Sequence, residues 1–285
     1  MSSEFTNGDL DQRVVIVTLT SDGVATQYEG LAMSAKGIKA SETVMNQCEV
    51  TILNLSGADR ERILKETNPF FNKGKNISIT VEAGRVSTGT TVLYTGRVFR
   101  SRGTAKPNLG VVLRCIQGFD NRAKTVSRSA TEITNLSSIA QWVAEDNGYT
   151  LSFEITDKKI ARYSFTGSAQ ASLSQLQALA GNTVNVYVDN ETLYINDSGV
   201  PANGLPVRVL DKTSGLISAE GTEYGVKVKM LFDTVTRIGG QIDLTSEINP
   251  SLNGSYKVRK LPFHVTSRDV PFYYVAECNR IDRTR

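Results

Sequence analysis

Apolar and polar residues alternate along much of the chain, and this alternation predicts β-strands. In the first part of the chain it runs through residues 13–23, 47–56, 76–84, 91–100 and 110–120. An alternation with period two places every second side chain in a core, as in strands that bury one face. Short segments of turn-forming residues separate these stretches, which is typical of a β-sandwich or barrel.

The last part of the chain returns to this pattern after a connector. Residues 198–206 are rich in glycine and proline and predict a loop. Beyond the loop, alternation predicts strands at residues 226–232, 241–246, 256–265 and 272–278. The C-terminal part is therefore expected to form β-structure again.

A short helix interrupts the first set of strands. Ser56 stands at the N-cap position of residues 57–68, and Asp59 follows at the capping-box position. Pro69 is expected to end the helix, because proline cannot continue the hydrogen-bond ladder. A helix in this place is expected to cover a sheet edge or to close one end of a barrel.

The middle of the chain predicts a small mixed module. Apolar residues recur at helical spacing in residues 135–148 and 168–181, and a glycine follows each predicted helix. Residues 185–197 then indicate two short strands that turn at Asp189 and Asn190, which is a hairpin pattern.

These patterns predict a mainly β, α+β fold with a few short helices. Two β-barrel or sandwich domains are expected to flank the mixed module. We expect the first β domain in residues 1–122, the mixed helix and hairpin module in residues 123–200, and the second β domain in residues 201–285. The sequence shows no repeat with a period of about 20–50 residues.

Composition narrows the functional classes. The chain has 285 residues, of which 40% are apolar, and its formal net charge is +3. Basic residues are scattered among acidic ones, which does not indicate a nucleic-acid-binding protein. Residues 1–12 are polar and acidic, unlike a signal peptide, and no stretch of about 18 apolar residues occurs. We therefore expect no membrane insertion by this chain.

The three cysteines, Cys48, Cys115 and Cys278, are widely spaced. Their odd number and spacing exclude a disulfide framework and a zinc ribbon. Each lies in an alternating apolar stretch, so buried free thiols are expected, as in a protein that folds in a reducing cytoplasm.

The sequence offers little that resembles catalytic chemistry. His264 is the only histidine and lies in an alternating stretch, so a strand position is expected for it. Glu145 and Asp146 lie at a predicted helix end, and Asp243 and Glu247 flank a predicted strand, where solvated charge is the expected role. We expect no catalytic, cofactor-binding or metal-binding residue.

One basic segment allows two interpretations. Arg97, Arg100, Arg102 and Lys106 lie close to Phe99 in the sequence. Basic residues around an aromatic side chain are typical of strands and loops that bind single-stranded nucleic acid. The same residues also suit a solvated hairpin, and the sequence leaves both interpretations open.

The C-terminal part carries a series of motifs in a distinctive order and spacing. A Gly-Leu-Ile turn is expected first, followed by a Gly-Val pair before an alternating strand and then a Gly-Gly break. The structural motif residues are Gly215, Leu216, Ile217, Gly225, Val228, Gly240, Tyr256 and Phe272. Together they resemble the C-terminal half of baseplate hub proteins from contractile-tailed bacteriophages, a tail-hub family with tail-tube-like domains. Residues 49–63 and 172–195 fit the first β domain and the inserted module of that family.

The resemblance implies a structural, non-catalytic hub subunit with two tail-tube-like β domains. It implies a homotrimer, in which three chains would present six such domains and adapt a sixfold tail tube to a threefold central spike. The implied partners are the spike protein, the tail-tube or tube-initiator protein and, less directly, tape-measure and baseplate wedge proteins. DNA would pass through the lumen without specific binding. The implied location is the tail baseplate of the virion, after assembly in the cytoplasm of a host bacterium, and no cofactor is implied.

Two other functions stay open at this point. A tail-tip protein could use its middle module to bind or degrade cell-wall glycan, which would need a carboxylate pair in one cleft. The segment from Arg97 to Lys106 could bind single-stranded nucleic acid. The sequence does not distinguish a phage from a tailocin or a secretion machine.

Overall fold

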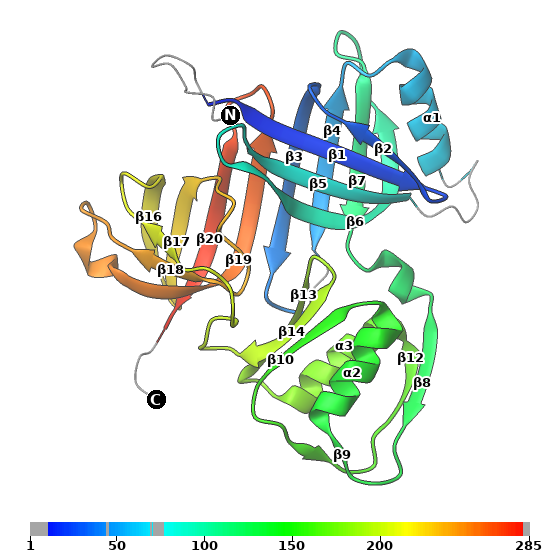
Figure 1. Cartoon of the computed structure of the whole chain (residues 1–285), viewed down its shortest axis with the longest axis vertical. Helices are drawn as coiled ribbons and strands as arrows, with labels where there is room; N and C mark the ends of the chain where they lie inside the picture. The colour runs from blue at the N-terminus through cyan, green and yellow to red at the C-terminus, as the bar shows by residue number, and fades with distance from the viewer. Residues whose placement is uncertain (1–10, 44–45, 69, 71–76, 282–285) are drawn as a thin grey trace, which may run out of the picture.

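The alternating stretches pair into one large, mostly antiparallel sheet that contains strands from both ends of the chain (Figure 1). The computed structural model describes residues 11–43, 46–68, 70 and 77–281. Pro69, the predicted end of the first helix, lies outside these residues. The strands of the large sheet are β1 (Arg13–Ser21), β2 (Val24–Tyr28), β3 (Ala32–Ala40), β4 (Gln47–Leu53), β5 (Ile77–Arg85), β6 (Gly89–Gly103), β7 (Gly110–Ile116), β15 (Arg208–Leu210), β16 (Leu216–Thr222), β17 (Gly225–Leu231), β18 (Gln241–Leu244), β19 (Gly254–Thr266) and β20 (Phe272–Arg280).

The strand order joins the two ends of the chain. It runs β16-β17-β20-β19-β3-β4-β7-β6-β5-β1-β2. Outside this path, β18 pairs with β19 on one side and with β15 on the other. The join is the antiparallel pairing of β19 with β3, from Thr266 opposite Ser34 to Lys260 opposite Ala40. The large sheet therefore includes residues of both predicted β domains, and the boundaries after residues 122 and 200 stay predictions.

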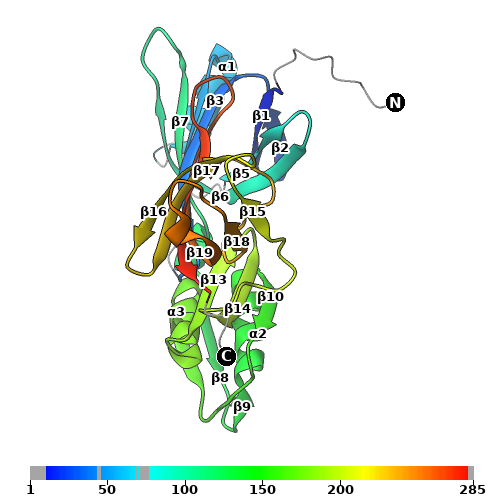
Figure 2. The same ribbon diagram turned by 90° about the vertical axis from the view of Figure 1, so that its left-hand side faces the viewer.

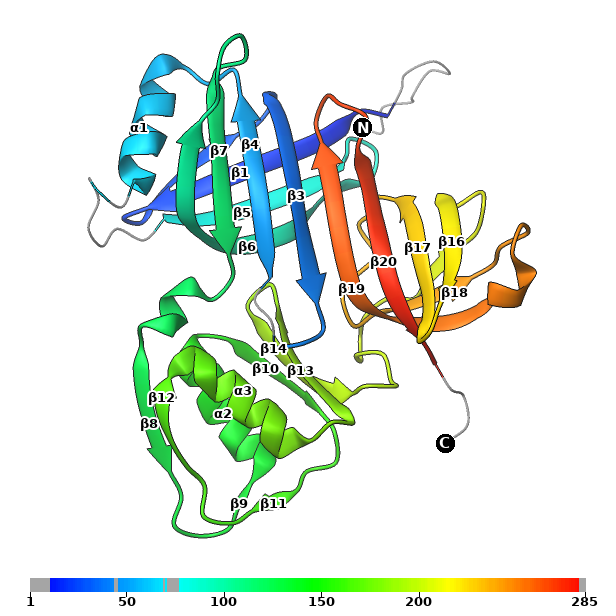
Figure 3. The same ribbon diagram turned by 180° about the vertical axis from the view of Figure 1, so that it is seen from behind.

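The long strand β6 folds the sheet back on itself. Its first residues pair with β5 and its last residues pair with β7, and the register with β7 shifts between Val98 and Arg100. A bulge of this kind bends and twists a strand. As a result, β1 and β5 cross behind β3, β4 and β7 as a second layer, as Figure 3 shows.

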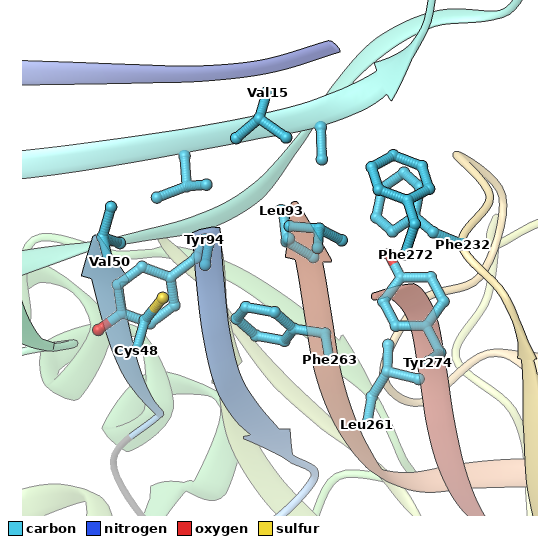
Figure 4. Packing of buried hydrophobic residues seen from close by; sticks show 14 of the residues in the cluster. Val15, Cys48, Val50, Leu93, Tyr94, Phe232, Leu261, Phe263, Phe272 and Tyr274 are labelled. Atoms are coloured by element: carbon cyan, nitrogen blue, oxygen red, sulfur yellow. The ribbon is translucent and has the colours of Figure 1, made fainter. Parts of the chain in front are cut away.

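The space between the layers holds a hydrophobic core built from both ends of the chain. Val17 and Ile79 from one layer and Val50 and Val228 from the other are completely buried. Figure 4 shows the large side chains of this core, which fill the gap between the layers. The burial of one face of each strand explains the alternation in the sequence, and the prediction of a β-rich α+β fold is confirmed.

The middle of the chain forms a smaller unit below the large sheet (Figure 1). Two helices pack on the three-stranded sheet β10-β14-β13 and share a second hydrophobic core with it. The elements of this unit are β8 (Thr125–Ser129), β9 (Thr134–Asn135), α2 (Leu136–Asn147), β10 (Thr150–Glu154), β11 (Lys159–Ile160), β12 (Ser164–Ser168), α3 (Ala169–Ala180), β13 (Val184–Asp189) and β14 (Thr192–Asp197). Outside it lie α1 (Gly57–Thr67) and two short 3-10 helices, η1 (Phe119–Arg122) and η2 (Pro250–Leu252).

Local signals for helix ends and turns are confirmed. The backbone N–H of Asp59 donates to the Ser56 hydroxyl at 3.0 Å, which caps α1. Gly148 follows α2 in the left-handed conformation. The predicted hairpin is β13–β14, but its turn consists of Asn190 and Glu191, one residue later than predicted. In the described part of the chain, no helix is long and apolar enough to cross a membrane.

Candidate functional site

His264 lies on β19 as a strand residue, as predicted. Its Nε2 is 3.3 Å from the Ser34 hydroxyl, and its ring meets the edge of the Tyr273 ring. Burial and then the nearby Lys36 lower the pKa of His264, so the neutral imidazole is favoured. Among the described residues, no group of three or more His, Cys, Asp or Glu side chains could hold a metal ion.

The cysteines are buried free thiols, as predicted. Cys48 on β4 and Cys115 on β7 stand opposite each other in neighbouring strands, and Cys278 lies on β20. Burial raises the pKa of all three thiols, which disfavours the reactive thiolate form. Their environment is that of core residues.

The carboxylates considered for glycan chemistry make local contacts. Asp146 accepts two hydrogen bonds from the Arg128 guanidinium, at 3.0 and 2.7 Å. Glu145 accepts a hydrogen bond from Gln141 one helical turn earlier. In the second half of the chain, Glu247 pairs with a lysine and Asp243 accepts from a glutamine on its own strand. Glu145 and Glu247 are exposed, as expected of solvated charge, whereas the Asp146 side chain is only 14% exposed and Asp243 is half-buried.

The predicted Gly-Leu-Ile turn is only partly a turn. Gly215 ends the turn with a φ of +105°, a conformation that favours glycine. Leu216 and Ile217 instead open β16, and the register with β17 shifts between Leu216 and Ser218. Ile217 is exposed, which places its side chain outside the core.

The other two motif glycines lie where backbones approach closely. Gly225 opens β17 with a φ of +155°, and an added Cβ would lie 2.3 Å from the carbonyl oxygen of Cys278. The carbonyl of Gly240 accepts a hydrogen bond from the Val258 N–H at 2.9 Å. The Gly-Gly break thus leads the chain from β17 into β18 and against β19.

Two motif aromatics belong to the core. The buried Tyr256 donates its hydroxyl hydrogen to the carbonyl of Leu252 at 2.7 Å. The ring centre of the buried Phe272 lies 5.0 Å from the Arg13 guanidinium and 5.5 Å from that of Arg85. Cation–π contacts of this kind connect the C-terminal strand β20 to β1 and β5.

Two buried lysines hold the middle module against the large sheet. Lys39 on β3 pairs with Asp189 at 2.5 Å and donates to the side chain of Asn190 at 3.3 Å. Lys257 on β19 donates to the carbonyl oxygen of Asp197 at 2.8 Å. Sequence reasoning missed these contacts, because a lysine in a strand ordinarily indicates a solvent-facing position.

One face of the large sheet is uncovered in the described structure except at its β6 edge, where Phe119 of η1 stacks on Phe99, and Figure 3 shows this face toward the viewer. We call this the outer face. It consists of the side chains on β17, β20, β19, β3, β4, β7 and β6 that point away from the core. Strand pairing sets side chains of this face opposite one another in the order Leu231, Tyr273, His264, Lys36, Glu49, Arg114, Arg100.

The outer face is rich in basic side chains. On β17, Val226 and Val228 are buried while Lys227 between them is exposed, as expected from the alternation. The basic residues of this face are Lys36, Arg100, Arg102, Arg114, Lys227, Lys229 and Lys260. Its acidic residues include Glu49, which pairs with Arg114, and Glu277, which pairs with Arg259.

The basic segment found in the sequence divides between two environments. Arg97 forms an ion pair with Asp120 and lies over the ring of Phe119. Phe99 stacks on the same Phe119 ring, with the ring centres 6.1 Å apart. Arg100 and Arg102 instead join the outer face beside Arg114 on β7. Their neighbours across the sheet, such as Lys36, are distant in sequence.

The sequence matches a known family over most of its length. A family model described as baseplate hub gp41 matches residues 14–278. A comparison with curated proteins found no match. The matched range covers the large sheet and the middle module together.

Solved structures share the fold at low sequence identity. A 43 kDa tail protein of prophage MuSo2 from Shewanella oneidensis aligns with a TM-score of 0.61 and 12% identity, over 93% of this chain and 97% of that one. A tail protein from Neisseria meningitidis aligns with a TM-score of 0.62 and 8% identity, over 93% and 96%. The E. coli c3393 protein, described as a type VI secretion component similar to the T4 tail proteins gp27 and gp5, aligns with a TM-score of 0.61 and 8% identity, over 93% and 77%.

Proposed function

The chain belongs to the baseplate hub gp41 family, and from this premise we propose that it is the structural hub subunit of a contractile phage tail. Three copies would form a ring that adapts the sixfold tail tube to the threefold central spike. The function is mechanical and organisational and needs no catalysis.

One observation supports the threefold ring most directly. Each half of the chain contributes four neighbouring strands to the continuous sheet, namely β16, β17, β20 and β19 from one half and β3, β4, β7 and β6 from the other. Three copies would therefore offer six units of this kind. A ring with that property matches a sixfold neighbour on one side and a threefold neighbour on the other.

The sheet also ends in edges suited to pairing between subunits. Among the described strands, β16 pairs only with β17 at one end of the path, and β2 pairs only with β1 at the other. Edge strands carry unpaired N–H and C=O groups that pair readily with another chain. A closed ring would satisfy these groups, since a cyclic assembly leaves no free edge.

The proposed partners are the central spike protein and the tail-tube or tube-initiator protein, with tape-measure and baseplate wedge proteins as further neighbours. The subunit would be made in the host cytoplasm and would reside in the tail baseplate of the virion. The family and the fold shared with tail proteins support this location. The local pairing of His264, Asp146 and Glu247 supports a non-catalytic role.

Mass photometry of the chain alone and after co-expression with its candidate spike protein tests the proposal. We expect a species at three times the chain mass of 31.1 kDa, either alone or bound to the spike. A monomer that binds neither spike nor tube protein would contradict it. A peptidoglycan turbidity assay should show no clearing, and clearing would favour the glycan-degrading alternative.

A further inference from the structure

The outer face holds two clusters of basic side chains, one from each half of the chain. The first cluster comprises Lys36, Arg100, Arg102 and Arg114, on β3, β6 and β7. The second comprises Lys227, Lys229 and Lys260, on β17 and β19. Each half thus presents positive charge on the same continuous face.

We propose that the outer face binds the phosphate backbone of double-stranded DNA without reading its sequence. This inference rests on the proposed function, because a hub on the path of the tail tube lies beside DNA in transit. It goes beyond that function by assigning a ligand and named residues to a surface.

The charge of the clusters is available to a ligand. Four of these basic residues are exposed, namely Lys36, Arg100, Arg102 and Lys227. None of the four forms an ion pair with another described residue. Glu49 stands opposite Lys36, and Glu220 and Glu277 stand opposite Lys227, so the least compensated charges are those of Arg100 and Arg102. Exposed positive charges attract counterions, and duplex DNA carries about one negative charge per 1.7 Å of its axis. Positive side chains that replace those counterions gain free energy from counterion release.

The geometry of the face suits an extended rigid polyanion. Neighbouring strands lie about 4.8 Å apart, so the strands from β17 to β6 span roughly 30 Å. Arg100 and Arg114 stand directly opposite each other, and Arg102 stands opposite Val112 next to them. The buried Val112 lies beneath the stems of these arginines, whose guanidinium groups remain in solvent.

A protein partner fits this face less well. Protein interfaces have an apolar centre with aromatic anchors and few charged residues. Of the partly exposed apolar residues of the outer face, Ile38 on β3 and Phe99 on β6 line one hollow together with charged side chains, and Leu231 lies on β17. Phosphate contacts from flexible lysines and arginines require no such centre.

Fluorescence anisotropy with a labelled duplex of random sequence tests the inference on the full chain. We expect binding that weakens steeply between about 50 and 200 mM salt and that does not depend on base sequence. The triple variant Lys36→Glu, Arg100→Glu, Arg102→Glu should bind at least about tenfold more weakly, and its log–log salt slope should fall by about three.

The matched control makes the same charge change elsewhere. Lys65→Glu, Lys159→Glu, Arg162→Glu alters exposed residues of α1 and the middle module, and it should leave binding within about twofold of the unaltered chain. An equal loss of DNA affinity in both triple variants would overturn the proposal, because the affinity would then depend only on the net charge of the chain. Binding that resists salt would also overturn it and would indicate a partner other than DNA.

The same variants separate this proposal from the hub function. The outer-face triple variant should keep its circular dichroism spectrum and its assembly with the spike protein. A chain that assembles but does not retain the duplex at low salt would refute DNA binding and leave the hub role intact. A chain that binds the duplex as described but never assembles would refute the hub role instead.

Discussion

The conformation and the burial of single residues in this protein depend on contacts that the neighbouring residues in the sequence do not reveal. Gly225 and Gly23 both adopt a positive φ, yet only Gly225 is pressed against another strand. Lys257 occupies a strand position like that of an ordinary surface lysine, yet only 2% of it is exposed. Substitutions at Gly225 and Lys257 therefore test how much a close strand contact and a buried charge each affect stability.

Gly225→Ala is expected to destabilise the protein strongly. The new Cβ would lie 2.3 Å from the Cys278 carbonyl oxygen, so strands β17 and β20 would have to separate locally. Urea unfolding should show a loss of about 3 kcal/mol or more, or an insoluble product. Gly23→Ala is the matched control, because φ is +80° there and nothing lies within 4 Å. It should lose only about 1 kcal/mol, and equal losses would show that strand contact is unimportant.

Lys257 should make stability rise with pH in the alkaline range. Burial lowers the pKa of Lys257 from 10.5 to about 8. Between these two values the unfolded chain holds more protons at this group than the folded chain, so the free energy of unfolding increases as pH rises. Below about pH 8 the full cost of the buried charge is present.

Chemical unfolding at several pH values checks this expectation. From pH 7 to pH 10.5, the unaltered chain should gain up to about 3 kcal/mol relative to Lys257→Met. Lys227→Met, which removes an exposed lysine of β17, should keep the pH profile of the unaltered chain. If the free energy of unfolding of Lys257→Met changes with pH in parallel with that of the unaltered chain, the buried charge of Lys257 is not the cause of the pH dependence.

Among the strands, alternation predicted those with large apolar side chains at the buried positions and missed β3, where such side chains are few. β1, β5, β7 and β17 are rich in valine, isoleucine and leucine at the buried positions, and the sequence predicted all four. β3 has only two large apolar residues, the buried Met33 and the exposed Ile38, among alanine, serine, glycine and lysine, and no local pattern indicated it. Its conformation comes from pairing with β4 and β19 on either side.

The alternation in β17 can be tested by placing the same charge on its two faces. Val228→Asp would place a carboxylate at a completely buried position with no partner, so the variant should be insoluble or lose at least about 3 kcal/mol. Lys227→Asp puts an acid on the exposed neighbour and should change the free energy of unfolding by less than about 1 kcal/mol. A soluble, assembled Val228→Asp protein would contradict the role of this face.

For the whole molecule, the middle module is attached through polar contacts that are buried. The Lys39–Asp189 pair exposes only 4% and 8% of its two side chains. Removal of one partner of a buried ion pair leaves an uncompensated charge, which costs more than replacement of both partners. The pair therefore couples the stability of the module to that of the large sheet.

Lys39→Met should loosen this coupling. Trp142, the only tryptophan of the chain, lies in α2 and reports on the module by fluorescence. We expect a loss of about 3–5 kcal/mol, with the fluorescence transition preceding loss of the β signal in circular dichroism. The double variant Lys39→Met, Asp189→Leu should recover part of the loss. Additive losses would show that the pair does not act as a unit.

Local sequence signals account for the features that depend on near neighbours. Period-two alternation set most strands, the Ser56 cap set the start of α1, and Gly148 set the end of α2, because these signals act over a few residues. The pairing of β3 with β19, the burial of Lys39 and Lys257, and the position of Lys36 on one face with Arg100 and Arg114 arise only in the folded chain. Those features depend on strands that are distant in the chain, and the free energy of such contacts exists only once the strands have met.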